Sequence, residues 1–263
     1  MRIDEAVVSR AIIDRYHEKL HKMLDLDVAI AGAGPAGLTA AYYLAKRGIR
    51  TGVFEKKLSV GGGMWGGGML FNEIVVQESG KAVLDEFGVS TRRYAEGYYT
   101  ADSVEATSTL CSKAVQAGAL VFNCIAIEDV VMKESAVCGL VINWTPVEMA
   151  GLHVDPLALN CRFLVEATGH PLEVLKVIEK KNAVRLATDT GRIVWEASMD
   201  ATRGECDCVE YTREIFPNVY VAGMAANAAF GRPRMGPVFG GMLLSGRKVS
   251  GLIAERLLER CPG

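Results

Sequence analysis

The pattern of apolar and polar residues divides the start of the chain into a helix, a strand, a second helix and a second strand. Between residues 4 and 24, apolar side chains recur at spacings of three and four, as in a helix with one apolar face: Val8, Ile12, Tyr16, Leu20 and Met23. Apolar runs at 26–31 and 51–54 predict buried strands on either side of a helical stretch that ends near Arg47. This order of elements is typical of an α/β fold with a parallel sheet.

The rest of the chain continues this alternation less regularly. The predicted elements are helices at about 78–87 and 102–117, strands at 119–122, 163–166 and 219–223, a pair of strands at 125–132 and 137–144, and a final helix from about Gly240. We expect a single dinucleotide-binding domain over residues 1–263, with an N-terminal helix at about 4–24 and an inserted region of strands and loops at about 124–160.

A glycine motif lies between the first predicted strand and the helix after it. Gly32, Gly34 and Gly37 form G-x-G-x-x-G, in which the first glycine permits a tight turn, the second lets the backbone approach a pyrophosphate, and the third allows close helix packing. Glu55 ends the next strand, near the spacing of about 20 residues at which an acid binds ribose hydroxyls. The motif predicts NAD or FAD rather than NADP; the alternative is a related sheet that keeps the turn without the ligand.

Glycine is also unusually frequent, with 28 residues. Six lie in the segment 61–68 and six more between 223 and 246. Glycine-rich loops expose backbone N–H groups that bind anions. We therefore expect these segments and the first glycine motif to face one ligand, although a flexible linker is an alternative for 61–68.

Composition and charge exclude several classes of protein. Half of the 263 residues are apolar and the formal net charge is −2, so clustered basic surface for binding nucleic acid is not expected. The seven cysteines are scattered and odd in number, which favours reduced thiols in the cytoplasm. Residues 28–45 carry no charge, but glycines and Pro35 interrupt them, so a membrane span is not expected either.

Two short motifs could be mistaken for metal sites. His17, Glu18 and His21 form H-E-x-x-H, but a nucleotide-type strand follows directly and few other histidines exist, so we interpret the motif as a solvated helix face. Cys206 and Cys208 form C-x-C without evident further ligands, which favours an ordinary loop.

The late motifs resemble two known groups of proteins. The opening glycine motif and Ala167-Thr168-Gly169 are similar to the two-dinucleotide-binding flavoproteins, but Met224 follows Gly223 where those proteins carry an acid, which disfavours a flavin. The whole set is more similar to the thiamine thiazole synthase family. The residues that carry this resemblance are Gly32 to Gly37 with Glu55-Lys56, Gly61 to Gly68, His153-Val154-Asp155-Pro156, Ala167 to His170, Val221 to Met224, and Arg234 to Pro237.

The resemblance implies a Rossmann-like α/β fold of this flavoprotein type, with a central parallel sheet and a smaller β excursion. It implies that the dinucleotide is lined by Gly32, Gly34, Ala36, Gly37, Glu55, Lys56, Gly63, Ile127, His153 and Met224. Arg234 would bind the carboxylate of glycine, and Asp155 and His170 would hold Fe(II). The family builds such sites across subunit boundaries, so a homo-oligomer, often an octamer, is expected.

His153 indicates which branch of the family the sequence resembles. Eukaryotic members carry a cysteine there that gives up its own sulfur, whereas an imidazole cannot donate sulfur. The resemblance therefore implies the archaeal branch, which makes ADP-thiazole from NAD, glycine and free sulfide and releases nicotinamide. In that reaction His153, Asp155 and His170 would be the catalytic residues, with His153 able to move protons near neutral pH.

Three other functions are left open by the sequence. A flavin-dependent oxidoreductase would share the fold, and an enzyme resembling ribose-1,5-bisphosphate isomerase would share the ketose-forming chemistry. An NAD-binding sensor without catalysis would share the dinucleotide turn alone.

Overall fold

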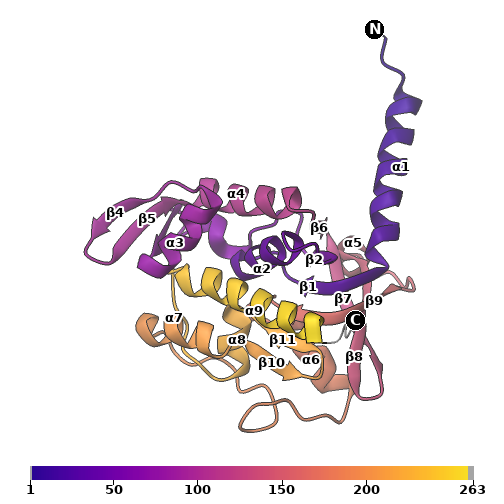
Figure 1. Ribbon diagram of the computed structural model, residues 1–263. Coiled ribbons are helices and arrows are strands. Elements are labelled where there is room, and N and C mark those ends of the chain that lie inside the picture. Colours follow the sequence, from indigo (N-terminus) through magenta and orange to yellow (C-terminus); the bar gives the residue numbers. More distant parts are fainter. Residues whose placement is uncertain (1, 260–263) are drawn as a thin grey trace.

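The computed structural model describes residues 2–259, and one large sheet forms the centre of the molecule (Figure 1). Its strand order is β10-β11-β9-β1-β2-β6, and β8 pairs with both β9 and β7. The bounds are β1 Asp25–Ala31, β2 Thr51–Glu55, β6 Leu120–Asn123, β7 Ile125–Lys133, β8 Ala136–Trp144, β9 Leu157–Glu166, β10 Arg213–Phe216 and β11 Val219–Val221. Strands β11, β9, β1, β2 and β6 are parallel, and the remaining pairs are antiparallel.

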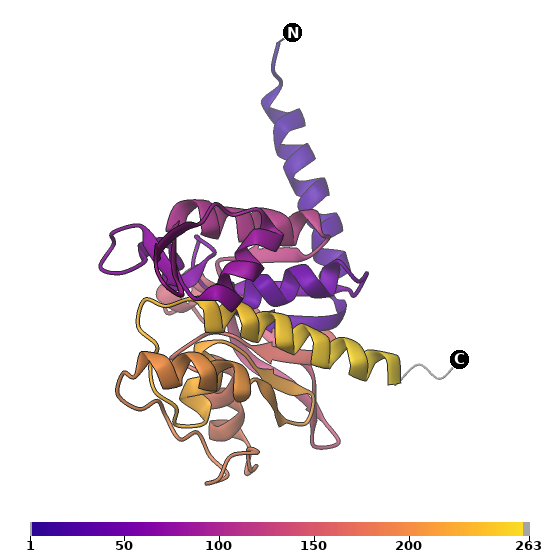
Figure 2. The same ribbon diagram turned by 60° about the vertical axis from the view of Figure 1, so that its left-hand side comes forward.

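Helices cover the sheet, and a second, three-stranded sheet lies at one end of the molecule. The helices are α1 Glu5–Met23, α2 Pro35–Ala45, α3 Glu78–Phe87, α4 Ser103–Gln116, α5 Thr145–Met149, α6 Glu173–Lys181, α7 Ala201–Glu210, α8 Met224–Ala229 and α9 Gly240–Glu259, with a 3₁₀ turn, η1, at Gly62–Gly66. The small antiparallel sheet has the order β3-β5-β4, with β3 Glu73–Val76, β4 Arg92–Ala95 and β5 Tyr98–Asp102. Figures 1 and 2 both show α9 lying along α2.

Strand β1 is buried on both faces and separates two hydrophobic cores. Val28 and Ile30 belong to the core beneath α2, α4 and α9. Ala29 and Ala31 belong to the core on the other face, which includes residues of α6, α8, β7 and β8. A strand covered on both sides needs a continuous apolar run rather than alternation, as the sequence of β1 provides.

Most of the predicted elements are confirmed within about two residues. The strand predicted at 163–166 is an exception, because β9 begins six residues earlier, at Leu157. Its first half pairs with β8 and is largely exposed, and Asn160 and Arg162 interrupt the apolar residues before Phe163. The small sheet, β10, α6, α7 and α8 were not predicted, because these elements are short and most of them mix polar with apolar residues.

The N-terminal helix is confirmed, but its apolar face is only partly covered by this chain. Met23 is buried, and Tyr16 and Leu20 are partly buried. Val8 and Ile12, nearer the N-terminus, are 48% and 65% exposed. Helix α1 projects away from the body of the molecule (Figure 1), which explains why the predicted stripe of apolar residues is not packed along its whole length.

The two motifs that could be mistaken for metal sites lie on helices. His17 and His21 are both exposed on α1, which agrees with a solvated helix face. The C-x-C motif lies on α7 rather than in the loop that the sequence suggested; Cys206 is exposed and Cys208 is buried. Among residues 2–259, no group of three or more His, Cys, Asp or Glu side chains could hold a metal ion. Cys261 lies outside the described residues.

The uncharged run at residues 28–45 is divided between β1 and α2. Within the described part of the chain, no helix is both long enough and apolar enough to cross a membrane.

Several glycines predicted to face a ligand instead let helices pack closely. A Cβ on Gly246 of α9 would lie 2.4 Å from the carbonyl oxygen of Ala36 on α2. A Cβ on Gly240 would lie 2.5 Å from a carboxylate oxygen of Glu205 on α7. Not every glycine of the three segments therefore faces a ligand, because close helix contacts also require residues without a side chain.

Glu205 anchors the start of α9. Its Oε1 accepts a hydrogen bond of 2.7 Å from the backbone N–H of Gly241, in the first turn of that helix. Its Oε2 is buried and has no hydrogen-bond partner. Burial raises the pKa of the Glu205 carboxyl above its usual value, and the Gly241 N–H lowers it only in part.

We predict that the stability of Glu205→Gln, relative to that of the wild type, increases as the pH rises. A raised pKa in the folded state means that folding takes up protons, so the wild-type group stabilises the protein at low pH and loses that contribution as the pH rises through its folded pKa. Glutamine mimics the protonated carboxyl and does not titrate. The melting temperature of the variant minus that of the wild type should increase between about pH 4 and pH 8. The exposed Glu96→Gln serves as the control; a flat difference for Glu205→Gln would contradict the prediction.

Candidate active site

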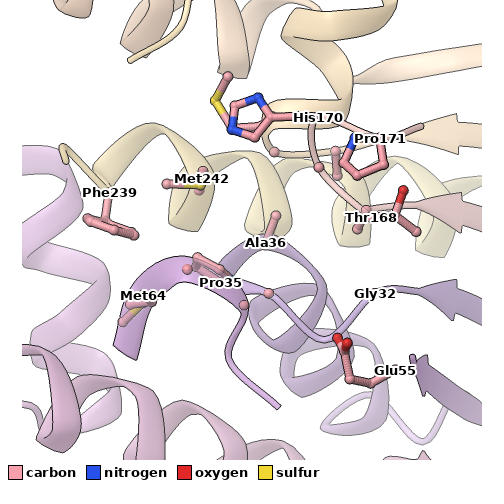
Figure 3. A pocket seen from close by; sticks show the side chains of 18 of the residues that line it. Gly32, Pro35, Ala36, Glu55, Met64, Thr168, His170, Pro171, Phe239 and Met242 are labelled. Atoms are coloured by element: carbon pink, nitrogen blue, oxygen red, sulfur yellow. The ribbon is translucent and has the colours of Figure 1, made fainter. Parts of the chain in front are cut away.

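One large cavity, of about 660 Å³, opens where the parallel strands end. It is lined by residues that follow the carboxyl ends of β1, β2, β9 and β11, together with η1 and the segment before α9. In open α/β sheets, ligands bind at this edge, where neighbouring strands connect in opposite directions. The volume lies within the range of small-molecule and cofactor sites. Figure 3 shows Glu55 and His170 on opposite sides of the cavity, with Pro35 and Ala36 between them.

The three glycines of the first motif have different steric roles. Gly32 has a φ of +94°, and a Cβ there would lie 2.5 Å from the carbonyl oxygen of Ala167. A Cβ on Gly37 would lie 2.1 Å from the carbonyl oxygen of Gly32. Gly34 lines the cavity, and a Cβ there would meet nothing within 4 Å. Gly32 and Gly37 are therefore required by the fold, whereas Gly34 leaves room at the N-terminus of α2, where an anion binds favourably.

Glu55 joins the ends of the first two strands. It is 8% exposed, its Oε2 accepts a hydrogen bond of 2.9 Å from the N–H of Ala33, and its Oε1 accepts one of 2.9 Å from the N–H of Lys57. A carboxylate has about four acceptor positions, so two remain for ribose hydroxyls. The negative charge at this place disfavours a second phosphate on the ribose.

Lys56 lies beside Glu55 and lines the same cavity. Its ammonium is 3.0 Å from a carboxylate oxygen of Glu148 and 3.6 Å from one of Glu173. The hydrogen bond to Glu148 is the largest of the effects that raise the pKa of Lys56, so this side chain is a cation near one end of the cavity.

Glu166 holds the loop that carries His170, a role that was not predicted from the sequence. It is fully buried at the end of β9. Its Oε1 accepts hydrogen bonds from the N–H and hydroxyl of Thr168, and its Oε2 accepts from the N–H groups of Val174 and Leu175 at the start of α6. Burial raises the pKa of Glu166 despite these four bonds. The carboxyl thus fixes both ends of residues 167–174.

Glu196 is a second carboxylate that was not predicted from the sequence, and it lies beside His170 and Arg234. Oε2 of Glu196 is 2.5 Å from Nδ1 of His170, and its Oε1 is 3.8 Å from Nε of Arg234. His170 and Arg234 both line the cavity, whereas Glu196 does not. The structure therefore brings together two side chains that the sequence assigned to different tasks.

Most of the residues predicted to contact the dinucleotide, glycine or the metal ion line this cavity. These are Gly32, Gly34, Ala36, Glu55, Lys56, Gly63, Ile127, His170, Met224 and Arg234. Gly37 does not line it, because it packs against Gly32. His153 and Asp155 are exposed in the loop before β9 and are also not among the lining residues of this single chain.

The side chains at the His170 end of the cavity are of types that bind metal ions. Only one of the two predicted ligands, His170, lines the cavity of a single chain. The contact from Nδ1 of His170 to a carboxylate leaves Nε2 free for a ligand or a metal ion. Imidazole and carboxylate are common ligands of Fe(II), and a site with few protein ligands keeps positions open for substrate.

The parallel sheet, the glycine turn after β1 and the acid at the end of β2 define the class: an α/β protein with a Rossmann-like dinucleotide-binding fold. The crystal structure of L-proline dehydrogenase from P. horikoshii shares the fold with a TM-score of 0.56, over 88% of this chain and 94% of that one, at 14% identity. This confirms the predicted fold class and says nothing of activity.

Comparison of the sequence identifies the family within this class. The chain belongs to the Thi4 family, whose model matches residues 9–239. The thiamine thiazole synthase of Methanothermobacter thermautotrophicus is 57% identical over 98% of this chain and 100% of its own length. That of Pyrococcus abyssi is 52% identical over 96% of this chain and 98% of its own. The crystal structure of THI4 from Thermovibrio ammonificans has a TM-score of 0.96 and 54% identity, and covers 98% of this chain and 100% of that one.

The different roles of Gly34 and Gly37 can be separated by alanine substitution. Gly34→Ala should leave the free energy of unfolding within about 1 kcal/mol, because φ at Gly34 is −75° and the space is open. It should weaken NAD binding on the order of tenfold, or about 1.4 kcal/mol, because the methyl group projects into the ligand's space. Gly37→Ala should destabilise the fold by about 1–3 kcal/mol. Calorimetric NAD titration and urea unfolding measure both; equal effects of the two variants on stability would contradict this division.

Proposed function

We propose that this protein is a thiamine thiazole synthase that makes ADP-thiazole, the ADP ester of 5-(2-hydroxyethyl)-4-methylthiazole-2-carboxylate, from NAD, glycine and sulfide. One observation carries the proposal. One cavity has the dinucleotide turn and Glu55 on one side and His170 on the other (Figure 3), and Arg234, which contacts the same carboxylate as His170, also lines it. In a member of the Thi4 family, this arrangement favours a dinucleotide that is consumed at one end while it is held at the other.

The ADP part of NAD is the portion that remains unchanged. The N-terminus of α2 at Gly34 suits the pyrophosphate, and Glu55 suits the adenosine ribose. Binding energy from this unreactive part positions the other ribose for reaction. That ribose loses nicotinamide, opens, isomerises and condenses with glycine, and sulfide then supplies the ring sulfur.

Arg234 suits the carboxylate of glycine. Its side chain is half exposed and lines the cavity, and a planar guanidinium binds a carboxylate through paired hydrogen bonds. His170 lies at the same end of the cavity, so glycine held by Arg234 is near the imidazole.

Fe(II) is the proposed cofactor, held by His170 and Asp155. When bound, it would supply a Lewis acid and a template for the glycine-derived part of the reaction. Asp155 does not line the cavity of its own chain, so the proposal requires that Asp155 comes from a neighbouring protomer. The exposed apolar face of α1 and the exposed loop at 150–155 favour such an oligomer, which we propose to be an octamer.

His153 lies two residues from Asp155 in the same exposed loop, so it would reach a neighbour's cavity in the same way. An imidazole cannot give up sulfur, which is why free sulfide is the proposed sulfur source. His153 can instead accept and return protons during isomerisation of the sugar, since imidazole is the side chain most often used as a general acid and base.

The reaction can be tested directly with the purified protein. Under anaerobic conditions with NAD, glycine, sulfide and Fe(II), mass spectrometry should detect ADP-thiazole in excess over enzyme, together with nicotinamide. Omission of sulfide should abolish thiazole formation, and the cysteines of the chain should not lose their sulfur. Nicotinamide release without thiazole would refute the proposal. Tight NAD binding without any consumption would also refute it and would favour the NAD sensor.

The proposed metal ligands can be tested separately from turnover. Asp155→Ala and His170→Ala should each lose retained Fe(II) and thiazole formation, while the melting temperature stays near that of the wild type, because both side chains are largely exposed. His21→Ala, which removes an exposed histidine of α1, is the matched control and should retain iron. Wild-type iron content in either site variant would show that the assignment is wrong.

A further inference from the structure

We propose that Glu196 is a positioning residue that fixes the tautomer and orientation of His170 and, through its other oxygen, the place of Arg234. Its side chain is 22% exposed, compared with 44% for His170 and 55% for Arg234. It contacts both residues but does not line the cavity itself. The proposal rests on the proposed function only for what His170 and Arg234 bind.

The short contact to Nδ1 determines how the imidazole is used. A carboxylate only accepts hydrogen bonds, so Nδ1 of His170 carries the proton and donates to Glu196. Nε2 is then the nitrogen with a free lone pair, and it is the one available to a metal ion or a substrate proton. Histidines that bind metals usually have such a carboxylate or carbonyl partner on the other nitrogen.

Backbone contacts on both sides of Glu196 hold it in place. Trp195, directly before it, has a φ of +68°, which is unusual for a bulky residue. Directly after it, Ala197 accepts a hydrogen bond from the N–H of Arg234, and its own N–H donates to the carbonyl of Arg232. Gly231 also has a positive φ, and a Cβ there would lie 2.6 Å from Val194. These contacts join the segment that carries Glu196 to the segment that carries Arg234.

A role in stability does not explain this arrangement. The Glu196–Arg234 pair is 3.8 Å long and half exposed on the arginine side, and such exposed pairs contribute about 0–1 kcal/mol. A single carboxylate that contacts both His170 and Arg234 restricts these side chains before a ligand binds. Less conformational entropy is then lost on binding.

Two substitutions at Glu196 separate its two contacts. Glu196→Ala removes both, so Fe(II) should bind about 10- to 100-fold more weakly in anaerobic equilibrium dialysis. Glu196→Gln keeps one acceptor oxygen for Nδ1 of His170 and loses the attraction for Arg234. It should retain Fe(II) affinity within about threefold of the wild type, but raise the KM for glycine.

The tautomer provides a readout that needs neither metal nor turnover. Solid-state NMR of ¹⁵N-histidine-labelled protein at one pH should show His170 with a protonated Nδ1 and a bare Nε2, its signals being assigned by their loss in His170→Gln. Glu196→Ala should shift His170 toward the Nε2–H tautomer, and Glu196→Gln should restore the wild-type form.

The matched control is Glu179→Gln. Glu179 has a similar exposure, 20%, and its carboxylate accepts from the N–H of Ile193 in the segment just before Glu196, but it contacts neither His170 nor Arg234. We expect wild-type tautomer, Fe(II) affinity and KM for glycine. Equal losses in Glu179→Gln and Glu196→Ala would show that a loosened segment is responsible and would overturn the proposal.

The outcomes distinguish this inference from the proposed function. If the wild type makes no thiazole but Glu196→Ala changes the tautomer of His170, the positioning role stands and the proposed function fails. If the wild type makes thiazole and Glu196→Ala leaves tautomer, Fe(II) affinity and KM for glycine unchanged, the positioning role fails alone. Should Glu196→Ala not fold, a wild-type KM for glycine in Glu196→Gln, or an Nε2–H tautomer in the wild type, would still overturn it.

Discussion

The close approach of α2 to β1 on one side and to α9 on the other is the constraint on which this structure depends. At both contacts the space is too small for a Cβ, since Gly37 meets the carbonyl of Gly32 and Gly246 meets the carbonyl of Ala36. Because α2 is buried on almost all sides, its N-terminus is fixed relative to the sheet. That end of the helix forms the floor of the cavity (Figure 3), so helix packing and ligand binding use the same glycine-rich sequence.

Carboxylates bind the loops around the cavity to the ends of strands and helices. Glu55 joins the ends of β1 and β2, and Glu166 joins the end of β9 to the start of α6. Glu205 holds the start of α9, and Glu196 contacts two side chains of the cavity. Glu55, Glu166 and Glu205 each accept hydrogen bonds from backbone N–H groups, and burial raises the pKa values of Glu166 and Glu205. The loops around the cavity are therefore fixed by acids rather than by apolar packing alone.

The cavity of one chain is lined by the glycine turn, Glu55, His170 and Arg234, but not by the full set of proposed catalytic groups. His170 and Arg234 are present, whereas His153 and Asp155 lie on an exposed loop elsewhere on the same chain. Under the proposed function, a division of this kind makes the chemistry depend on assembly, because the groups proposed to move protons and complete the metal site would come from a second protomer. The exposed apolar residues of α1 are in keeping with such an arrangement.

The sequence by itself determined the order of the main strands and helices, the nucleotide turn and most of the cavity's lining, because these depend on local periodicity and on glycines at fixed spacing. Gly32, Gly34 and Glu55 could be assigned since their motif has a steric reason that operates within about 30 residues. Only the tertiary structure decided that Gly246 packs against α2, that Glu166 fixes the loop of His170, and that Glu196 contacts His170 and Arg234. The contacts of Gly246 and Glu196 join segments far apart in sequence, and those of Glu166 depend on the path of the chain after β9. No periodicity distinguishes a single glutamate that accepts buried hydrogen bonds from one that is solvated.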